Sequence, residues 1–346
     1  MKVKIYTHDN IELTTLFQID FEGLNYRKAN QEAGTASFVV RVDNPKITGD
    51  TVRVYNRVKI YNDSGIVEFS GFTLTTTIEL ETIQITVAGI LGILKVRTMP
   101  FNYTLSGDIN TCLQTVIDHA NSIEDTGIRS GQLLGTGSIN RQFNGDDVFS
   151  AITDIVEGNA CQFYFDHNTH EITVKPQVGV NRSNDIVFQY DTRNVLLSNL
   201  SSFRVVDNGD SVCTVASGRV DASNNEILDN DLVAKYGRIE RNKAYRTISN
   251  TDLATQLYSE LSESEYSPDL VLSPQITDSF DVGDIVGVRL YNKVVDIDTA
   301  YQILEKEIVF SGNERSIRIR VNKKQTDIID VIKKHEKDIK SLSNHL

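Results

Sequence analysis

Apolar and polar residues alternate through much of the first hundred residues, as in strands that are buried on one face only. Such alternating or β-branched stretches are found at residues 52–54, 58–60, 66–69, 73–77 and 82–87. The turn-forming residues Asn62 to Gly65 separate two of them. We therefore predict an N-terminal β domain, residues 1–99, built as an antiparallel barrel or sandwich.

A helical period replaces the alternation after Met99 and Pro100. Apolar residues then recur at spacings of three and four, at Ile109, Leu113, Val116, Ile117 and Ala120. A second helix is predicted at residues 146–157, capped by Asn144 or Asp146 and ended by Gly158. Two short apolar stretches, 162–165 and 171–174, flank a polar turn and predict a hairpin. Residues 100–200 are therefore predicted to form an α+β insertion domain.

The remaining body of the chain is predicted as a mixed α/β segment, residues 201–265, followed by a second β domain, residues 266–325. The mixed segment contains a predicted strand at 212–215 and a predicted helix at 252–263. Strands are predicted at 285–288, 301–304, 308–310 and 317–321, the last two joined by the loop 311–314. Residues 286–321 loosely repeat the pattern of residues 58–87, which fits an internal repeat and a chance likeness of two antiparallel sheets equally well.

A heptad pattern marks the last predicted element, a helix at residues 326–346. Its apolar seam consists of Ile328, Ile332, His335, Ile339, Leu342 and Leu346. A seam this narrow favours a coiled coil between chains, and a helix folded back on its own domain is the alternative. Ile at both kinds of seam position is compatible with three strands, whereas Ile paired with Leu favours two, so the seam alone leaves the number of strands open.

The composition excludes some classes of function. Lys and Arg total 35 and Asp and Glu total 47, so the formal net charge is −12, which argues against a surface that binds nucleic acid by bulk attraction. Trp is absent, which weakens a sugar-stacking platform. Cys112, Cys161 and Cys213 are widely spaced and predict neither disulfides nor a zinc site. The chain lacks an apolar signal segment near Met1 and a long apolar run, so we expect a soluble protein made in a reducing compartment.

Few residues suggest chemistry. His167 and His170 flank a turn that we interpret as a solvated hairpin turn, with a metal site as the much less favoured alternative. Motifs of zincins, of serine hydrolases and of phosphate-binding loops are absent. Residues 280–284, Phe-Asp-Val-Gly-Asp, predict a turn into a strand and nothing catalytic. No catalytic, cofactor-binding or metal-ligating residue is predicted, and no cofactor is expected.

Taken in order, several of these segments resemble the hub proteins of phage tails and baseplates, which include siphophage tail-associated proteins and contractile-tail hubs. The resemblance rests on the small-residue segment 30–40, the hairpin 58–72, the segment 236–240, the helix 252–263, the turn 280–284, and the closing strands 301–303 and 317–321. Each motif is weak by itself, and their order along nearly the whole chain carries the match.

The resemblance implies an α+β, mainly β fold, with two tail-tube-like β-barrel domains flanking the α+β middle region and a C-terminal helix. It implies a structural homotrimeric ring that adapts a sixfold tail tube to a threefold tip and mounts a spike or fibre protein. The implied partners are further copies of the chain, a distal tail or tail-tube ring and the tape-measure protein. DNA would only pass through the channel, and no stable membrane association is expected.

The implied location is the virion, at the tail tip or baseplate, after assembly in the cytoplasm of the bacterial host. Enzymatic activity is not expected, because a short helix stands where many relatives carry a peptidase, lysozyme or fibre domain. The alternative is a β-rich enzyme of a phage tail that binds or depolymerises polysaccharide, for which paired carboxylates near aromatic residues would be required. A non-phage injection machine built on the same hub is a third possibility.

Overall fold

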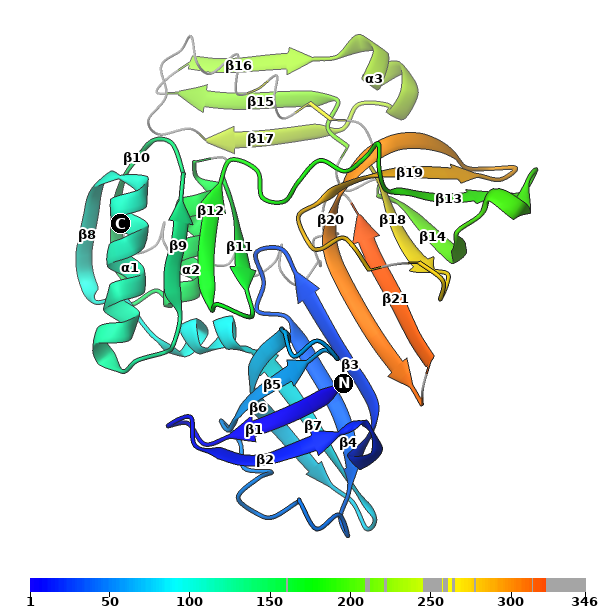
Figure 1. Ribbon diagram of the computed structural model, residues 1–346. Helices are drawn as coiled ribbons and strands as arrows, with labels where there is room; N and C mark the ends of the chain where they lie inside the picture. Colours follow the sequence, from blue (N-terminus) through cyan, green and yellow to red (C-terminus); the bar gives the residue numbers. More distant parts are fainter. Residues whose placement is uncertain are drawn as a thin grey trace. The chain divides into compact units, whose positions relative to one another are not determined.

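The structure is a computed structural model of the chain (Figure 1). It describes residues 1–159, 161–208, 212–220, 223–244, 257, 261–262, 265–276, 278–312 and 314–321. The chain packs as two compact units, one of residues 1–203 and 270–321 and the other within residues 204–269. The described part is mainly β, as the sequence predicts.

A large sheet dominates the first unit. Its N-terminal members are β1 (Lys2–Tyr6), β2 (Glu12–Phe17), β3 (Phe21–Ala29), β4 (Thr35–Arg41), β5 (Arg57–Tyr61), β6 (Val67–Ile78) and β7 (Thr82–Gly89), with η1 (Gln18–Asp20) after β2. Its later members are β13 (Val187–Asp191), β14 (Leu200–Asn208), β18 (Glu265–Leu272), β19 (Ile285–Tyr291), β20 (Asp296–Ser311) and β21 (Glu314–Val321), with η3 (Val195–Leu197) after β13. Among the described residues these strands form the order β14-β18-β21-β20-β3-β4-β7-β6-β5-β1-β2, and β19 joins β20 and β13.

Alternation of burial explains why these segments are strands. In β1 and β5 the inward residues Val3, Ile5, Val58 and Ile60 are fully buried, while their neighbours along each strand are partly exposed. The antiparallel pairing of β3 with β20 joins the N-terminal strands to those after residue 285 in one sheet. The two segments that resemble one another in sequence, β5-β6-β7 and β19-β20-β21, are both antiparallel meanders. The arrangement of two tube-like barrels stays a prediction.

Four strand predictions are wrong in detail, and the first concerns residues 66–69 and 73–77, which belong to the single strand β6. Residues 52–54 lie in turns, because the backbone N–H groups of Thr51 and Val52 both donate to Thr48 O. The two strands predicted at 301–304 and 308–310 are one long strand, β20, which is kept continuous by pairing on both sides. The strand predicted at 212–215 begins only at Val215.

In the same unit, two helices and several short strands form a part that we call the helical layer. Its elements are η2 (Ile90–Val96), β8 (Phe101–Asp108), α1 (Ile109–Ile123), β9 (Arg129–Leu133), β10 (Ser138–Asn144), α2 (Val148–Glu157), β11 (Gln162–Asp166) and β12 (Glu171–Lys175). The small sheet of this layer has the strand order β11-β12-β9, and β10 pairs with β8. The helix and hairpin predictions are confirmed, with Asp108 capping α1 and Gly158 ending α2. The cap of α2 is Asp147 and not Asn144 or Asp146, since Asp147 accepts from the Ser150 N–H at 2.8 Å.

The core of this layer is apolar. Ile109, Leu113, Val116, Ile117 and Ala120 of α1 are all buried, as their spacing predicts. They pack with the buried face of α2 and with Phe163, Ile172 and Val174 of the small sheet. Cys112 and Cys161 are buried free thiols of this layer.

The second unit contains β15 (Val215–Val220), β16 (Ser223–Leu228), α3 (Asn230–Tyr236) and β17 (Glu240–Ala244), with the strands in the order β16-β15-β17. Cys213, Ala216 and Leu257 are buried together. Most of the helix predicted at 252–263 lies outside the described residues, as does the whole predicted coiled-coil helix with Ile328, Ile332, His335, Ile339, Leu342 and Leu346. No helix in the described part of the chain is both long enough and apolar enough to cross a bilayer.

Candidate functional site

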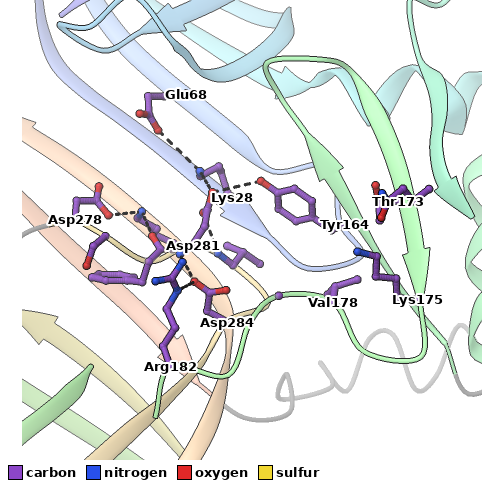
Figure 2. Close-up of a pocket in the computed structure, with 16 residues that line it drawn as sticks. Lys28, Glu68, Tyr164, Thr173, Lys175, Val178, Arg182, Asp278, Asp281 and Asp284 are labelled. Carbon is purple, nitrogen blue, oxygen red and sulfur yellow. Dashed lines mark hydrogen bonds and ion pairs between the residues drawn. The ribbon is translucent and has the colours of Figure 1, made fainter. Parts of the chain in front are cut away.

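A cluster of charged side chains, three of them buried, lies beside the β3–β20 pair of the first unit (Figure 2). We call it the charged joint, and it consists of Lys28, Arg182, Asp278, Asp281, Asp284 and Lys306. Lys28 of β3 and Lys306 of β20 are 6% and 3% exposed and stand directly opposite each other in the strand register. Like charges at opposite positions repel, so this pairing requires compensating carboxylates.

Two aspartates supply that compensation. Lys28 Nζ donates to Asp281 Oδ2 at 2.7 Å and lies 3.9 Å from Glu68 Oε2. Lys306 Nζ donates to Asp278 and to the carbonyl of Phe280 at 2.7 Å, and its ammonium lies over the Phe280 ring. Asp278 therefore pairs with Lys306 and Asp281 pairs with Lys28, so that each lysine has its own carboxylate.

The carboxylate of Asp281 is held in its ionised form. Burial raises the pKa of Asp281, but the charges of Lys28 and Lys306 and the hydrogen bond from Lys28 outweigh this and lower the pKa below its ordinary value. Tyr164 donates to the same oxygen at 3.3 Å, and burial next to Asp281 raises the pKa of that phenol. Asp281 thus stays ionised beside Lys28, and the Tyr164 phenol keeps its proton near neutral pH.

The turn 280–284 shapes one wall of the joint. Gly283 has φ +95°, as expected for the glycine of this turn, and Gly179 packs its Cα against the Gly283 backbone at φ +80°. Asp284 accepts from Val180 N at 2.8 Å and from Asp281 N at 3.1 Å, and Arg182 Nε lies 3.2 Å from it. The segment after β12 is therefore bound to the turn by backbone contact and by one buried carboxylate.

A pair of amides ties the hairpin β11–β12 to β20. Gln302 Nε2 donates to Gln162 Oε1 at 2.9 Å, and Gln162 Nε2 lies 3.1 Å from Gln302 Oε1. Gln302 also donates to the carbonyls of Gly283 and Val178 at 3.1 and 3.3 Å. The helical layer, the turn and the large sheet are connected through this one side chain.

The turn with His167 and His170 is solvated only in part, because Asn168 and Thr169 are exposed while His167 is buried, which corrects the sequence interpretation. His167 is 7% exposed and accepts at Nδ1 from the Ser70 backbone N–H at 3.1 Å, while its ring stacks on Phe69. Burial lowers the pKa of His167 to about 3 and that of His170 to about 4. Among the described residues no three His, Cys, Asp or Glu side chains are placed to hold a metal ion. The sequence pattern did not predict that this turn packs against β6.

A pocket of about 610 Å³ opens beside the charged joint. The joint forms one side, and the polar face of the small sheet, with Thr173 and Lys175, forms the other (Figure 2). None of its residues was predicted as a site. One signal of this site was available in the sequence. Lys28 continues the alternation of Leu24 and Tyr26, the inward-facing positions of β3.

Comparison with known proteins concerns the fold. Neither a protein-family model nor a curated protein sequence matches the chain. Among solved structures, prophage tail protein gp18 from Listeria monocytogenes matches with a TM-score of 0.64 at 14% identity, covering 98% of this chain and 100% of that one. The 43 kDa tail protein of prophage MuSo2 from Shewanella oneidensis matches with a TM-score of 0.64 at 10% identity, covering 93% and 98%.

A third match comes from outside phages. The E. coli c3393 protein matches with a TM-score of 0.50 at 8% identity, covering 88% of this chain and 74% of that one. It is described as a component of the type VI secretion system with structural similarity to the T4 tail proteins gp27 and gp5. Across these matches the chain has the fold of phage tail proteins, and the resemblance inferred from its sequence is confirmed at the level of fold.

Proposed function

We propose that the chain is a structural protein of a phage tail, the hub of a tail tip or baseplate. The observation that carries this proposal is the match to the Listeria prophage tail protein, which extends over 98% of this chain and all of the other. A likeness over whole chains favours a whole-protein role over a shared module. On this proposal the protein is located in the virion and acts without an enzymatic site of its own.

The surface supports a role in assembly. The η3 residues Val195, Leu196 and Leu197 are 64%, 97% and 59% exposed and adjacent in sequence. Contiguous exposed apolar residues are typical of surfaces that another protein covers. β2 is the last strand at one end of the large sheet in the described part of the chain. Its outer edge could therefore pair with a strand of another chain.

The finer proposal is a homotrimeric ring that adapts a sixfold tube to a threefold tip. The five-part domain division, with tube-like β domains at 1–99 and 266–325, belongs to this proposal, and the two similar meanders favour it. The helix 326–346 would form a parallel three-stranded coil that mounts a spike or fibre protein. The tail-tube ring and the tape-measure protein would be its other partners, and part of the −12 charge would line a channel for passing DNA.

Negative-stain microscopy and sedimentation of the full chain test the ring. We expect a threefold ring with an axial opening, and a compact monomer under conditions of assembly would contradict the proposal. In the Ile332→Asp, Ile339→Asp variant, charge in the seam should disrupt the coil and leave the body folded. An unchanged sedimentation coefficient for this variant would refute the coil and leave the ring to be judged from the images.

Activity assays test the non-enzymatic role. The purified chain should release no soluble fragments from peptidoglycan or host polysaccharide, and release would support the depolymerase alternative. The match to the type VI secretion component favours a second candidate, the same hub role in a non-phage injection machine. Co-purification from the producing cell distinguishes them, since a phage hub should purify with particles that contain phage tail-tube protein and a secretion hub should not.

A further inference from the structure

Among the described residues, one lysine beside the charged joint has no partner for its charge. Lys175 lines the pocket from the end of β12, and its side chain makes no hydrogen bond or ion pair in the described part of the chain. Figure 2 shows it across the pocket from Asp284 and Lys28. We propose that this pocket binds a carboxylate on a short apolar stem, presented by another protein, with Lys175 as its principal charged contact.

Strand alternation places the polar donors on this side. Tyr164 and Thr173 are register partners in the β11–β12 pair, as are Gln162 and Lys175, so all four side chains lie on one face of the small sheet. The other face carries the buried residues of the helical layer. Lys175, with Thr173 beside it on the same strand, therefore presents an ammonium and a hydroxyl to the pocket, and both can donate to a carboxylate.

The position of the one lining cation that lacks a carboxylate among the described residues favours an anion. Each lining carboxylate that the structure describes already has a cation: Glu68 and Asp281 share Lys28, Asp278 has Lys306 and Asp284 has Arg182. The four lining cations and four lining carboxylates balance in number, but Lys175 pairs with none of these carboxylates. A monovalent carboxylate would give Lys175 the partner that it lacks. A divalent phosphate would add a second negative charge beside four carboxylates, and a metal ion would have to displace a lysine or arginine from its partner.

The apolar residues that line the pocket favour an apolar stem next to the carboxylate. Val178, Phe280 and Val282 add apolar surface to the same pocket, whose volume of about 610 Å³ is far larger than a bare carboxylate needs. A glutamate side chain and the carboxyl end of a peptide with an apolar last residue both have this chemistry. The inference goes beyond the hub proposal and does not depend on it, since the pocket is complete within one chain.

Ligand-observed NMR titration of the full chain tests the proposal with defined probes. N-acetyl-leucine represents a peptide carboxyl end, N-acetyl-glutamate α-amide represents a glutamate side chain, and N-acetyl-leucine amide is the uncharged control. We expect the better of the two acids to bind at least about tenfold more tightly than the amide, the difference expected for a charge-assisted hydrogen bond. The tighter acid identifies the source of the carboxylate.

Variants assign the binding to Lys175. Lys175→Met should weaken the acid at least about tenfold and leave the melting temperature unchanged, because Lys175 makes no ion pair that folding would lose. Lys293→Met, at an exposed lysine of the β19–β20 turn outside the pocket, is the matched control and should bind as the parent does. Equal binding of acid and amide, equal binding by Lys175→Met and the parent, or tighter binding of inorganic phosphate than of either acid would each overturn the proposal. None of these results depends on ring formation.

Discussion

The helical layer and the charged joint belong to the same unit, but they are held together by different forces. In the layer, α1 and α2 present apolar residues at helical spacing to a core that contains no ion pair among its buried members. In the joint, two buried lysines face each other across β3 and β20 and depend on aspartates from a distant turn. Apolar burial stabilises in any orientation, whereas the joint is stabilising only while each charge keeps its partner.

This difference predicts how each region tolerates substitution. An apolar core loses stability in proportion to the atoms removed, so its response depends on size. The stability of the joint depends instead on backbone position and on charge, since displacement of the turn that carries the aspartates would leave the two buried lysines without partners. The following predictions compare the two regions, beginning with the largest expected effect.

Leu113→Ala in α1 should have the largest effect, a loss of about 4 kcal/mol in the free energy of unfolding, because Leu113 is fully buried in the helical layer. Chemical denaturation followed by circular dichroism measures it. Asp118→Ala on the exposed side of the same helix is the control, and it should change stability by less than about 0.5 kcal/mol. A loss below about 1 kcal/mol for Leu113→Ala would mean that the layer is not tightly packed.

Gly179→Ala should cost about 3 kcal/mol, because the new Cβ would meet the Gly283 carbonyl carbon at 2.1 Å and the backbone has φ +80°. Gly65→Ala is the matched control, since Gly65 has the same φ and no atom within 4 Å of the added Cβ. It should cost about 1 kcal/mol from the backbone conformation alone. Equal losses for the two variants would show that the close approach of Gly179 to the turn contributes nothing.

The same contrast explains what the sequence could predict. The spacing of Leu113, Val116 and Ile117 is local, so the helices of the layer were predicted with their boundaries nearly correct. The charged joint brings together Lys28 and Asp281, which are 253 residues apart, through the pairing of β3 with β20. No local pattern specifies such a pairing, and a lysine at an inward strand position is the only local sign of it.

The loss of one charge in the joint should have a smaller effect than the loss of its backbone geometry. Lys28→Met should cost about 2 kcal/mol, because Asp281 loses its charge-assisted hydrogen bond while Lys306 remains nearby and 38% of the Asp281 side chain stays exposed to water. Arg53→Met is the control, because Arg53 and Asp50 are each 70% exposed and their ion pair should contribute less than about 0.5 kcal/mol. Equal losses of stability in the two variants would show that the ion pair of Lys28 contributes no more than an exposed surface pair does.

The smallest effect concerns His167, which lies where the hairpin of the helical layer docks on β6. Burial, and after it the charge of Lys28, lower the pKa of His167 from 6.5 to about 3. Between these values the unfolded chain binds a proton on this histidine and the folded chain does not, so stability falls as the pH falls from about 6.5 towards 3. The contribution is about 1.4 kcal/mol for each pH unit well inside this window, and the loss accumulated at pH 5.5 is likewise about 1.4 kcal/mol.

His167→Asn isolates this contribution, because an asparagine oxygen can accept the Ser70 N–H as Nδ1 does and does not titrate. Denaturation at pH 7.5 and at pH 5.5 should therefore show a smaller loss of stability on acidification in the variant than in the parent. His8→Asn, at an exposed histidine outside the hairpin, should lose as much as the parent. If the variant and the parent lose the same stability between the two pH values, His167 is protonated in the folded protein, and the hairpin is not buried against β6.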